Sequence, residues 1–296
     1  MSASSADLSR REELVAPSAS ELERVVWMLW FQGFENAPEI VRLCRHSWKT
    51  RNPTWKVVEL TDENLSDYID SDTLSMMRSL DMSRQTLSDL IRIYLLSRHG
   101  GVWVDATCFC CKPLDDWLPE YMPSGFFAFR SPGPDRLLAN WFLAARKGNL
   151  LASVLYEKHR DFFLKNKFPL QNTKRGRNRV KAIRSTLNRN PTIAQLWTYP
   201  LLTRTIGVYP YFIFHYQFAR TVRENKECRE IWDKTPPFSA DIPRKMNKTG
   251  ILSPMTDELL DDLEQAKDPL YKLTYKYRQE YFTNGCILYH IMRSIA

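Results

Sequence analysis

Residues Ser88 to Thr107 read SDLIRIYLLSRHGGVWVDAT, in which a helical pattern is followed by two glycines and a short apolar strand. The apolar positions recur every three or four residues and form one helix face: Leu87, Leu90, Ile91, Tyr94 and Leu95. Polar side chains repeat at the same spacing on a second face: Gln85, Ser88, Asp89 and Arg92. Because Gly100 is a natural left-handed cap, the helix is predicted to end there.

The strand after this helix is predicted over residues 102–110, VWVDATCFC, and it carries an acid at Asp105. Strand and helix patterns alternate around it, which is typical of a sheet with mostly parallel strands. Ligands bind such sheets beyond the carboxyl ends of the strands. Asp105 is therefore a candidate ligand-binding residue, and the presence of a threonine at position 107, rather than a second acid, needs an explanation.

Further strands and helices are predicted on both sides of this segment. The expected strands cover residues 24–33, 54–62 and 125–131. The expected helices cover residues 37–53, 62–69 and 71–80, with one or two more over 137–163 and a break near Gly148. The aromatic segment 209–218 fits a buried strand or helix. The predicted fold class is α/β, with a mostly parallel central sheet flanked by helices and a helical C-terminal part.

The length of 296 residues fits one large domain, predicted over residues 24–296. Residues 1–23 are polar and charged and are predicted to form a flexible arm before the first strand. They lack the apolar core of a signal peptide. No apolar run reaches the length of a membrane span. We therefore expect a cytoplasmic protein.

The six cysteines are Cys44, Cys108, Cys110, Cys111, Cys228 and Cys286. A zinc site needs spaced ligand pairs, and the run CFCC has no matching Cys or His pair elsewhere. Buried free thiols are expected instead, as in a reducing compartment.

The net charge of +8 is concentrated in one part of the chain. The span from Phe162 to Arg223 contains no Asp or Glu, and a basic cluster lies within it: Lys174, Arg175, Arg177, Arg179, Lys181 and Arg184. Three interpretations compete. The cluster is a solvated helix face, it contacts nucleic acid, or it faces a phosphorylated substrate or an anionic membrane.

Several motifs in this order resemble one protein family. They are WFQG at residues 30–33, the segments 37–69 and 88–107, FFAFRS at 126–131 and NWFLAARKGN at 140–149. Together they resemble the capsular polysaccharide synthesis proteins, which are related to the DXD sugar-transferases of glycosyltransferase family 32. The similarity runs from about Val25 to Arg146 and resumes at YKLTYK, residues 271–276.

This resemblance implies a GT-A-type fold and the transfer of a sugar from a nucleotide-sugar donor to a glycan hydroxyl, in capsule or surface polysaccharide synthesis. It implies a donor-binding half, residues 24–130, and an acceptor-side and helical half, residues 131–296. The catalytic residues implied are Asp105 and Asp89. The donor-binding residues implied are Trp30, Asp89, Arg92, Asp105, Thr107 and Asn140. In relatives such as the clostridial glucosylating toxins, a helix presents Asp and Arg to the donor at the spacing of Asp89 and Arg92, and a Trp matched by Trp30 stacks on the base.

Sugar transfer releases a nucleoside diphosphate whose growing negative charge must be stabilised. Two aspartates serve this purpose in the DXD pattern, and Thr107 takes the second position here. A neutral hydroxyl is a poor ligand for Mn²⁺ or Mg²⁺. The resemblance implies a divalent metal, with Asp105 as a candidate ligand and His215 as a further one. The presence of Thr107 in place of the second acid argues against this metal. The basic cluster at 174–184 is a candidate for meeting part of the phosphate charge.

Other interpretations stay open for these residues. Asp89 and Arg92 could form only a local ion pair, and Asp105 could cap a turn. The remaining alternatives are core packing for Trp30 and His215, a helix cap for Asn140, and ordinary surface exposure for Lys272 and Lys276.

Two other functions compete with the glycan transferase. One is a toxin-like enzyme that glycosylates a protein, and the other is a non-catalytic protein that binds nucleic acid or an anionic surface. The spacing of Asp89, Arg92 and Asp105 favours the transferase. The expected partners are a nucleotide-sugar donor, a glycan acceptor and, peripherally, the anionic inner face of the membrane. No nucleic acid is expected.

Overall fold

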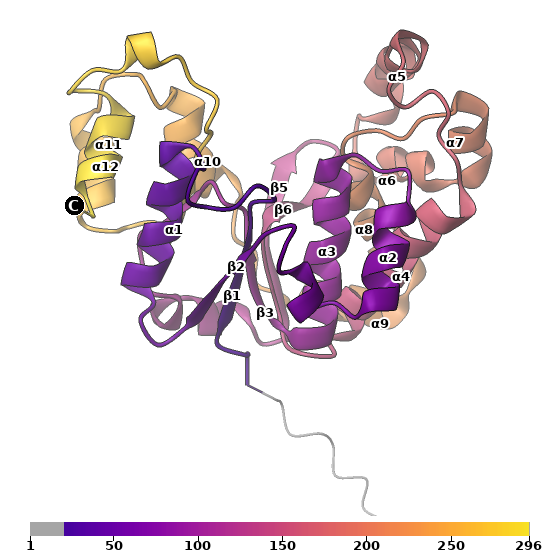
Figure 1. The fold of residues 1–296 in the computed structure, drawn as a ribbon, viewed down its shortest axis with the longest axis horizontal. Coiled ribbons are helices and arrows are strands. Elements are labelled where there is room, and N and C mark those ends of the chain that lie inside the picture. Colours follow the sequence, from indigo (N-terminus) through magenta and orange to yellow (C-terminus); the bar gives the residue numbers. More distant parts are fainter. Residues whose placement is uncertain (1–20, 296) are drawn as a thin grey trace, which may run out of the picture.

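The central sheet has five strands in the order β2-β1-β3-β6-β5 (Figure 1). This computed structural model describes residues 21–295, so most of the predicted arm, residues 1–20, lies outside the described residues. The strands are β1 Val25–Leu29, β2 Lys56–Leu60, β3 Gly101–Val104, β5 Phe126–Gly133 and β6 Arg136–Ala145. β1 pairs in parallel with β2 and β3, whereas β6 pairs antiparallel with β3 and β5. All strands of this sheet except β6 therefore run in one direction, so the sheet is mostly parallel, as predicted.

Helices cover both faces of this sheet and make up most of the C-terminal part. They are α1 Glu39–Arg51, α2 Ser71–Ser79, α3 Arg84–His99, α4 Leu150–Lys165, α5 Lys174–Leu187, α6 Pro191–Ala194, α7 Pro200–Ile206, α8 Ile213–Glu224, α9 Lys226–Lys234, α10 Asp241–Thr249, α11 Asp257–Glu264 and α12 Ile287–Arg293. Figure 1 shows α1 with α10, α11 and α12 on one side of the sheet, and α2, α3, α4 and α8 on the other. The predicted α/β fold class, with a mostly parallel central sheet, flanking helices and a helical C-terminal part, is confirmed. The GT-A type of this fold stays a prediction.

Strand β1 is buried on both faces, which explains its continuous apolar sequence. Successive side chains of a strand point to opposite faces. Trp27 and Leu29 pack into the core on the α3 side, whereas Val26 and Met28 pack into the core on the α1 side. The sheet thus separates two apolar layers.

The turn from α3 into β3 requires glycine. Ser83 caps the start of α3 by accepting a hydrogen bond from the backbone N–H of Thr86 (3.2 Å). Gly100 ends the helix with a φ of 71°. The next residue, Gly101, has a φ of 93°, and a Cβ placed there would lie 2.4 Å from Val25 Cγ1. This close approach of β3 to β1 sets the position of the residues that follow β3.

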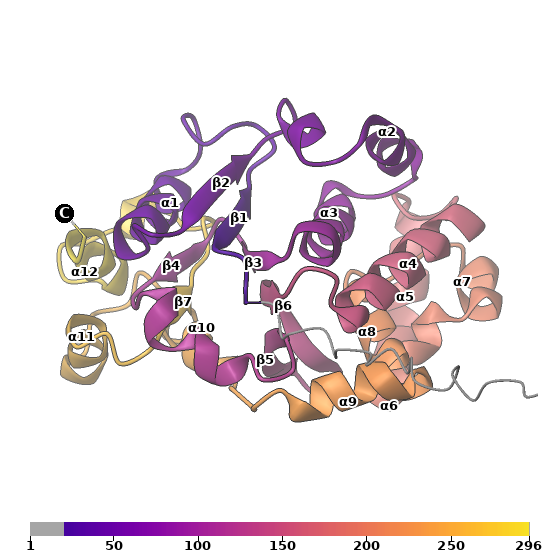
Figure 2. The same ribbon diagram turned by 90° about the horizontal axis from the view of Figure 1, so that it is seen from below.

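The prediction of one strand through residue 110 is wrong. Asp105 N–H still donates to Trp141 O on β6, and the chain then turns, because Cys108 N–H donates back to Asp105 O (both 2.8 Å). The residues after the turn form β4 (Cys108–Cys110), which pairs antiparallel with β7 (Leu270–Lys272) in a second, two-stranded sheet. Figure 2 shows β4 and β7 on the α1 side, beside α10.

The prediction of a helix across residues 137–145 is also wrong, since these residues form β6 between β3 and β5. β6 is buried along most of its length, and a short apolar run with both faces buried has no periodicity that separates strand from helix. The second half of the predicted helical segment is α4, and the break near Gly148 is confirmed. The aromatic segment 209–218, left open between strand and helix, belongs largely to helix α8.

Residues 22 and 23 and strand β5 lie at the two boundaries of the predicted domain organisation, which stays a prediction. At the end of the predicted arm, Leu22 packs against the core and the Glu23 carboxylate accepts a hydrogen bond from Lys147 N–H (3.0 Å). The expected division at residue 130 falls inside β5, so the sheet itself joins the two halves.

All six cysteines are buried free thiols, as predicted. Within residues 21–295, no helix combines the length and apolar character that crossing a bilayer requires.

Candidate active site

Asp105 lies just beyond the carboxyl end of β3 and is surrounded by three hydrogen-bond donors. Its Oδ1 accepts from an Arg92 guanidinium nitrogen and from Trp103 Nε1, both at 3.2 Å. Its Oδ2 accepts from Lys272 Nζ at 2.9 Å. Because the side chain makes these contacts, the alternative of a simple turn cap does not describe it.

Arg92 connects this carboxylate to a second one, Asp89, on the same helix. The Arg92 guanidinium lies 3.2 Å from Asp89 Oδ1 and donates to the backbone oxygen of Asn140 at 2.5 Å. It also lies 5.0 Å from the ring centre of Trp103, a cation–π contact. Arg92 and Asp89 are almost fully buried, so they form part of a desolvated network rather than a local surface ion pair.

Asn140 lies on β6 and completes the same network. Its Nδ2 donates to Asp89 Oδ1 at 2.8 Å. The helix-cap alternative for Asn140 is wrong because the residue belongs to a strand. The structure thus brings together Asp89, Arg92, Asp105 and Asn140. The catalytic and donor-binding roles that the resemblance implied for them stay predictions.

Lys272 is the residue that sequence analysis placed wrongly. Its ammonium donates both to Asp105 Oδ2 and to Thr107 Oγ1 (2.6 Å), and its side chain is only 19% exposed. The pairing of β7 with β4 puts Lys272 opposite Cys108 and therefore beside the turn at residues 105–107. Lys276, four residues later, is exposed as expected.

The two carboxyl groups of the network have opposite pKa shifts. Burial raises the pKa of Asp89 to about 6, although the Arg92 charge opposes this. Burial would also raise the pKa of Asp105, but the charges of Lys272 and Arg92 outweigh burial and hold that pKa at about 2. Burial would lower the pKa of Lys272, and the Asp105 carboxylate outweighs burial there too, so the lysine stays charged. Asp105 is thus a fixed anion, whereas Asp89 titrates near neutral pH.

Aromatic side chains border the charged network. Trp30 follows β1, is half-buried and packs edge-to-face on Tyr275, with ring centres 5.4 Å apart. This placement leaves both core packing and base stacking open for Trp30. Tyr211, just before α8, is 71% exposed.

The residues around Asp105 do not fit a divalent metal. Mg²⁺ and Mn²⁺ require several oxygen ligands, but both carboxylate oxygens of Asp105 and the hydroxyl oxygen of Thr107 already accept hydrogen bonds from cationic or indole donors. Residues 21–295 contain no group of three or more His, Cys, Asp or Glu side chains that could hold a metal. His215 is buried on α8, and burial together with the charges of Arg136 and Arg92 lowers its pKa well below the usual range. The charges of Arg136 and Arg92 also disfavour the binding of a metal cation at His215.

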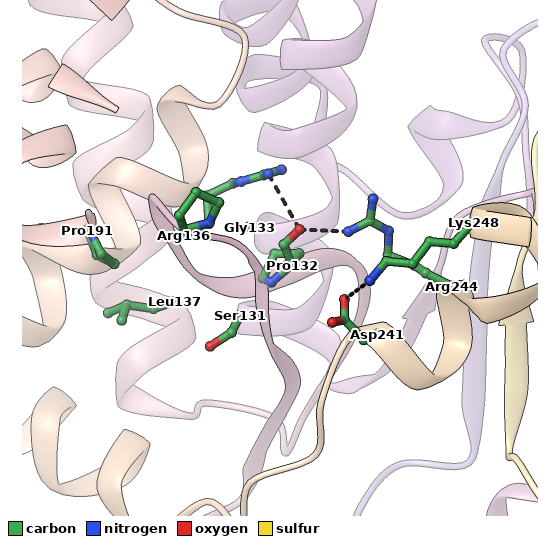
Figure 3. Close-up of a pocket in the computed structure, with 10 residues that line it drawn as sticks. Ser131, Pro132, Gly133, Arg136, Leu137, Pro191, Asp241, Arg244 and Lys248 are labelled. Atoms are coloured by element: carbon green, nitrogen blue, oxygen red, sulfur yellow. Dashed lines mark hydrogen bonds and ion pairs between the residues drawn. The ribbon is translucent and has the colours of Figure 1, made fainter. Parts of the chain in front are cut away.

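A separate cavity of about 530 Å³ opens beyond the hairpin that joins β5 and β6 (Figure 3). Three cationic side chains line it, Arg136, Arg244 and Lys248, against one acid, Asp241. Arg244 donates to the backbone oxygen of Pro132 at 2.6 Å, and Lys248 pairs with Asp241 at 2.6 Å.

The backbone of this hairpin is strained at the cavity. Ser131 lines the cavity with a φ of 56°, a left-handed conformation that costs a non-glycine residue about 1–3 kcal/mol. β6 runs from Arg136 at the cavity to Asn140 in the charged network, and four residues of strand span about 13 Å. The cavity and the network therefore lie along one strand.

The basic cluster at 174–184 lies on α5, away from the central sheet in Figure 1. Lys174, Arg175 and Arg177 are exposed, whereas Arg179 donates to the backbone oxygen of Ile206 (2.9 Å) at the end of α7. Contact of this helix with an anionic membrane stays a prediction.

Sequence analysis did not single out Trp103 or the residues of the cavity. Trp103 precedes Asp105 by two positions, and the two-residue period of a strand places both side chains on one face. That pattern was available in the sequence. The convergence of Arg136 with Arg244 depends on the packing of α10 against the hairpin, which no local pattern encodes.

A model of the capsular polysaccharide synthesis protein family matches residues 4–171 of this chain. The chain belongs to this family. The matched region includes Asp89, Arg92, Asp105 and Asn140, but it ends before α8 and β7. Lys272 and the α10 side of the cavity thus lie outside the part on which membership rests.

Three curated relatives are similar to the chain over part of its length. The O-glycosyltransferase braB of Annulohypoxylon truncatum is 31% identical over 146 residues, 43% of this chain and 34% of that protein. The glycosyltransferase afumC of Aspergillus fumigatus is 31% identical over 172 residues, 51% of this chain and 44% of that protein. Inositol phosphoceramide mannosyltransferase 1 of Schizosaccharomyces pombe is 28% identical over 153 residues, 49% of this chain and 46% of that protein. The chain spans less than half the length of each.

The raised pKa of Asp89 predicts a pH dependence of stability. The folded state holds the Asp89 proton up to about pH 6, whereas the unfolded chain releases it near pH 4, so ionisation of Asp89 destabilises the fold as the pH rises between these values. Relative to Asp89→Asn, the free energy of unfolding of the unmodified protein should fall by about 2 kcal/mol between pH 4 and pH 6.5. Urea titrations of both proteins at several pH values measure this difference. A difference that does not change with pH would show that burial does not control Asp89.

Proposed function

We propose that the chain is a glycosyltransferase that uses a nucleotide-sugar donor. The observation that supports this most strongly is the buried charged network of Asp89, Arg92, Asp105 and Lys272 beyond the carboxyl end of β3. A domain gains little stability from burying four charges. The free-energy cost of removing these four charges from water is explained if the network binds a charged and hydroxyl-rich ligand. The names of the relatives, all glycosyltransferases or a mannosyltransferase, support the same class of reaction.

Each residue of the network has a distinct role in this proposal. Lys272 and Arg92 supply positive charge for the diphosphate, and Asp105 holds both of them in place. Asp89, in its ionised form, accepts hydrogen bonds from sugar or ribose hydroxyls. Trp30 offers a ring for the base at the end of β1, next to Tyr275.

A ligand screen identifies the donor. UDP, GDP, CMP and their sugar conjugates are added separately, and the melting temperature is recorded. The true donor should stabilise the fold, by about 2.7 kcal/mol at a hundred times its Kd. The same donor is then used in a transfer assay.

Replacement of Asp105 tests the network directly. Asp105→Asn keeps the shape of the side chain but leaves Arg92 and Lys272 without a shared anion, so the transfer rate should fall by about 10²–10³-fold. Asp116→Asn is the matched control, because Asp116 is an exposed aspartate on the segment that follows β4. A transfer rate for Asp105→Asn equal to that of the control would exclude Asp105 from the reaction.

We further propose that the cavity at the β5–β6 hairpin receives the acceptor, and that this acceptor carries a phosphate or carboxylate group. Three cationic side chains against one lining acid favour an anion (Figure 3). The name of one relative, inositol phosphoceramide mannosyltransferase, denotes a phosphate-containing molecule. A role in capsule synthesis fits an anionic glycan acceptor equally well.

Charge preference among acceptors tests this assignment. With the donor fixed, KM for a sugar phosphate should be lower than KM for the same neutral sugar. Arg244→Gln should raise KM for the sugar phosphate by about tenfold or more, as loss of a hydrogen bond to a charged group predicts, and leave KM for the neutral sugar unchanged. Arg42→Gln, an exposed arginine on α1, is the control. Equal KM values for charged and neutral acceptors would argue against an anion site.

A further inference from the structure

The ammonium of Lys272 contacts the turn that carries Asp105 and Thr107, which occupy the two positions that hold acids in a DXD motif. It bridges Asp105 and Thr107, the first and last residues of the sequence Asp-Ala-Thr. We propose that Lys272 replaces the divalent cation in this chain and meets the charge of the leaving diphosphate directly. This inference rests on the proposed function, since it concerns the same donor site.

The substitutions at positions 107 and 272 are matched in charge. Two aspartates with a divalent cation have a formal charge of zero, and so do one aspartate, one threonine and one lysine. A second aspartate beside the lysine would leave an excess negative charge in a mostly buried site. Thr107 is therefore the residue expected beside Lys272, and this answers why the motif ends in a hydroxyl.

The geometry leaves Lys272 able to contact phosphate. A lysine ammonium has three N–H donors, and two of them point to Asp105 Oδ2 and Thr107 Oγ1. One donor remains for an oxygen of the diphosphate. Because Thr107 accepts from Lys272 with its oxygen, its own hydroxyl hydrogen is also free to donate.

The backbone around Lys272 fixes the ammonium in place. Lys272 is opposite Cys108 in the β4–β7 pair, and Leu273 N–H donates to Thr107 O at 2.8 Å. The backbone of Lys272 is thus held beside the turn that carries Asp105. Preorganised charge of this kind stabilises a developing anion without rearrangement during the reaction.

The transfer step balances without any further reagent. The bond between the anomeric carbon of the donor and the β-phosphate oxygen breaks, and its electron pair stays on that oxygen. The acceptor hydroxyl oxygen bonds to the anomeric carbon, and its proton passes to the departing diphosphate. Lys272 keeps its proton throughout and acts as a hydrogen-bond donor and a positive charge.

Binding of nucleoside diphosphates by the unmodified protein tests the inference first. Calorimetric titrations with UDP and GDP are made in EDTA and again with Mn²⁺. The Kd of the nucleotide that binds should agree within about twofold between the two conditions. Binding that requires Mn²⁺ would overturn the inference and leave the proposed function standing. Absence of binding under both conditions would overturn the proposed function and the inference with it.

Two variants then test the residue itself. Lys272→Met should weaken binding of the diphosphate by about tenfold or more, leave binding of the parent nucleoside unchanged, and gain nothing from Mn²⁺. Lys267→Met is the matched control, an exposed lysine just before β7. The double variant Thr107→Asp/Lys272→Ser restores the two-acid pattern and should bind the diphosphate only with Mn²⁺. Unchanged diphosphate binding by Lys272→Met would overturn the inference, and if this variant does not fold, the titrations of the unmodified protein still decide.

Discussion

The ion pair between Asp105 and Lys272 joins residues 167 positions apart in the sequence and connects the central sheet to the second one. Both side chains are mostly buried, and a buried charge is tolerated only when it is paired and hydrogen-bonded. The end of β3, the β4–β7 pair and the core of α10, α12 and α1 must therefore form together. The site exists only after the C-terminal part has folded back onto the first half.

The ion pair with Lys272 also makes the pKa of Asp105 differ from that of Asp89. Asp105 receives two cations and stays ionised far below neutral pH, whereas Asp89 shares one cation, accepts from an amide and is more deeply buried. Groups whose surroundings shift their pKa values in opposite directions serve different roles. In this protein, Asp105 keeps its negative charge beside Arg92 and Lys272, whereas the charge of Asp89 changes with pH near its pKa of about 6.

Local sequence patterns were sufficient for α3 and for the parallel strands β1 and β2. The apolar stripe and Gly100 located α3, and the alternation of strands and helices predicted the sheet, because short-range spacing determines both. β6 was missed since a strand buried on both faces has no distinctive period. Lys272 was dismissed because a lone lysine is usually a surface residue, and only its long-range pairing with β4 places it beside Asp105. The strongest evidence for the site thus comes from long-range contacts, which local sequence patterns do not predict.

The most direct test of this account is a crystal structure of the protein with its nucleoside diphosphate, grown with Mn²⁺ present. The account predicts that a phosphate oxygen lies about 3 Å from Lys272 Nζ, that Lys272 keeps its contacts with Asp105 and Thr107, and that no metal lies between Asp105 and the phosphate. A Mn²⁺ ion coordinated by Asp105, with Lys272 turned away from the diphosphate, would contradict it.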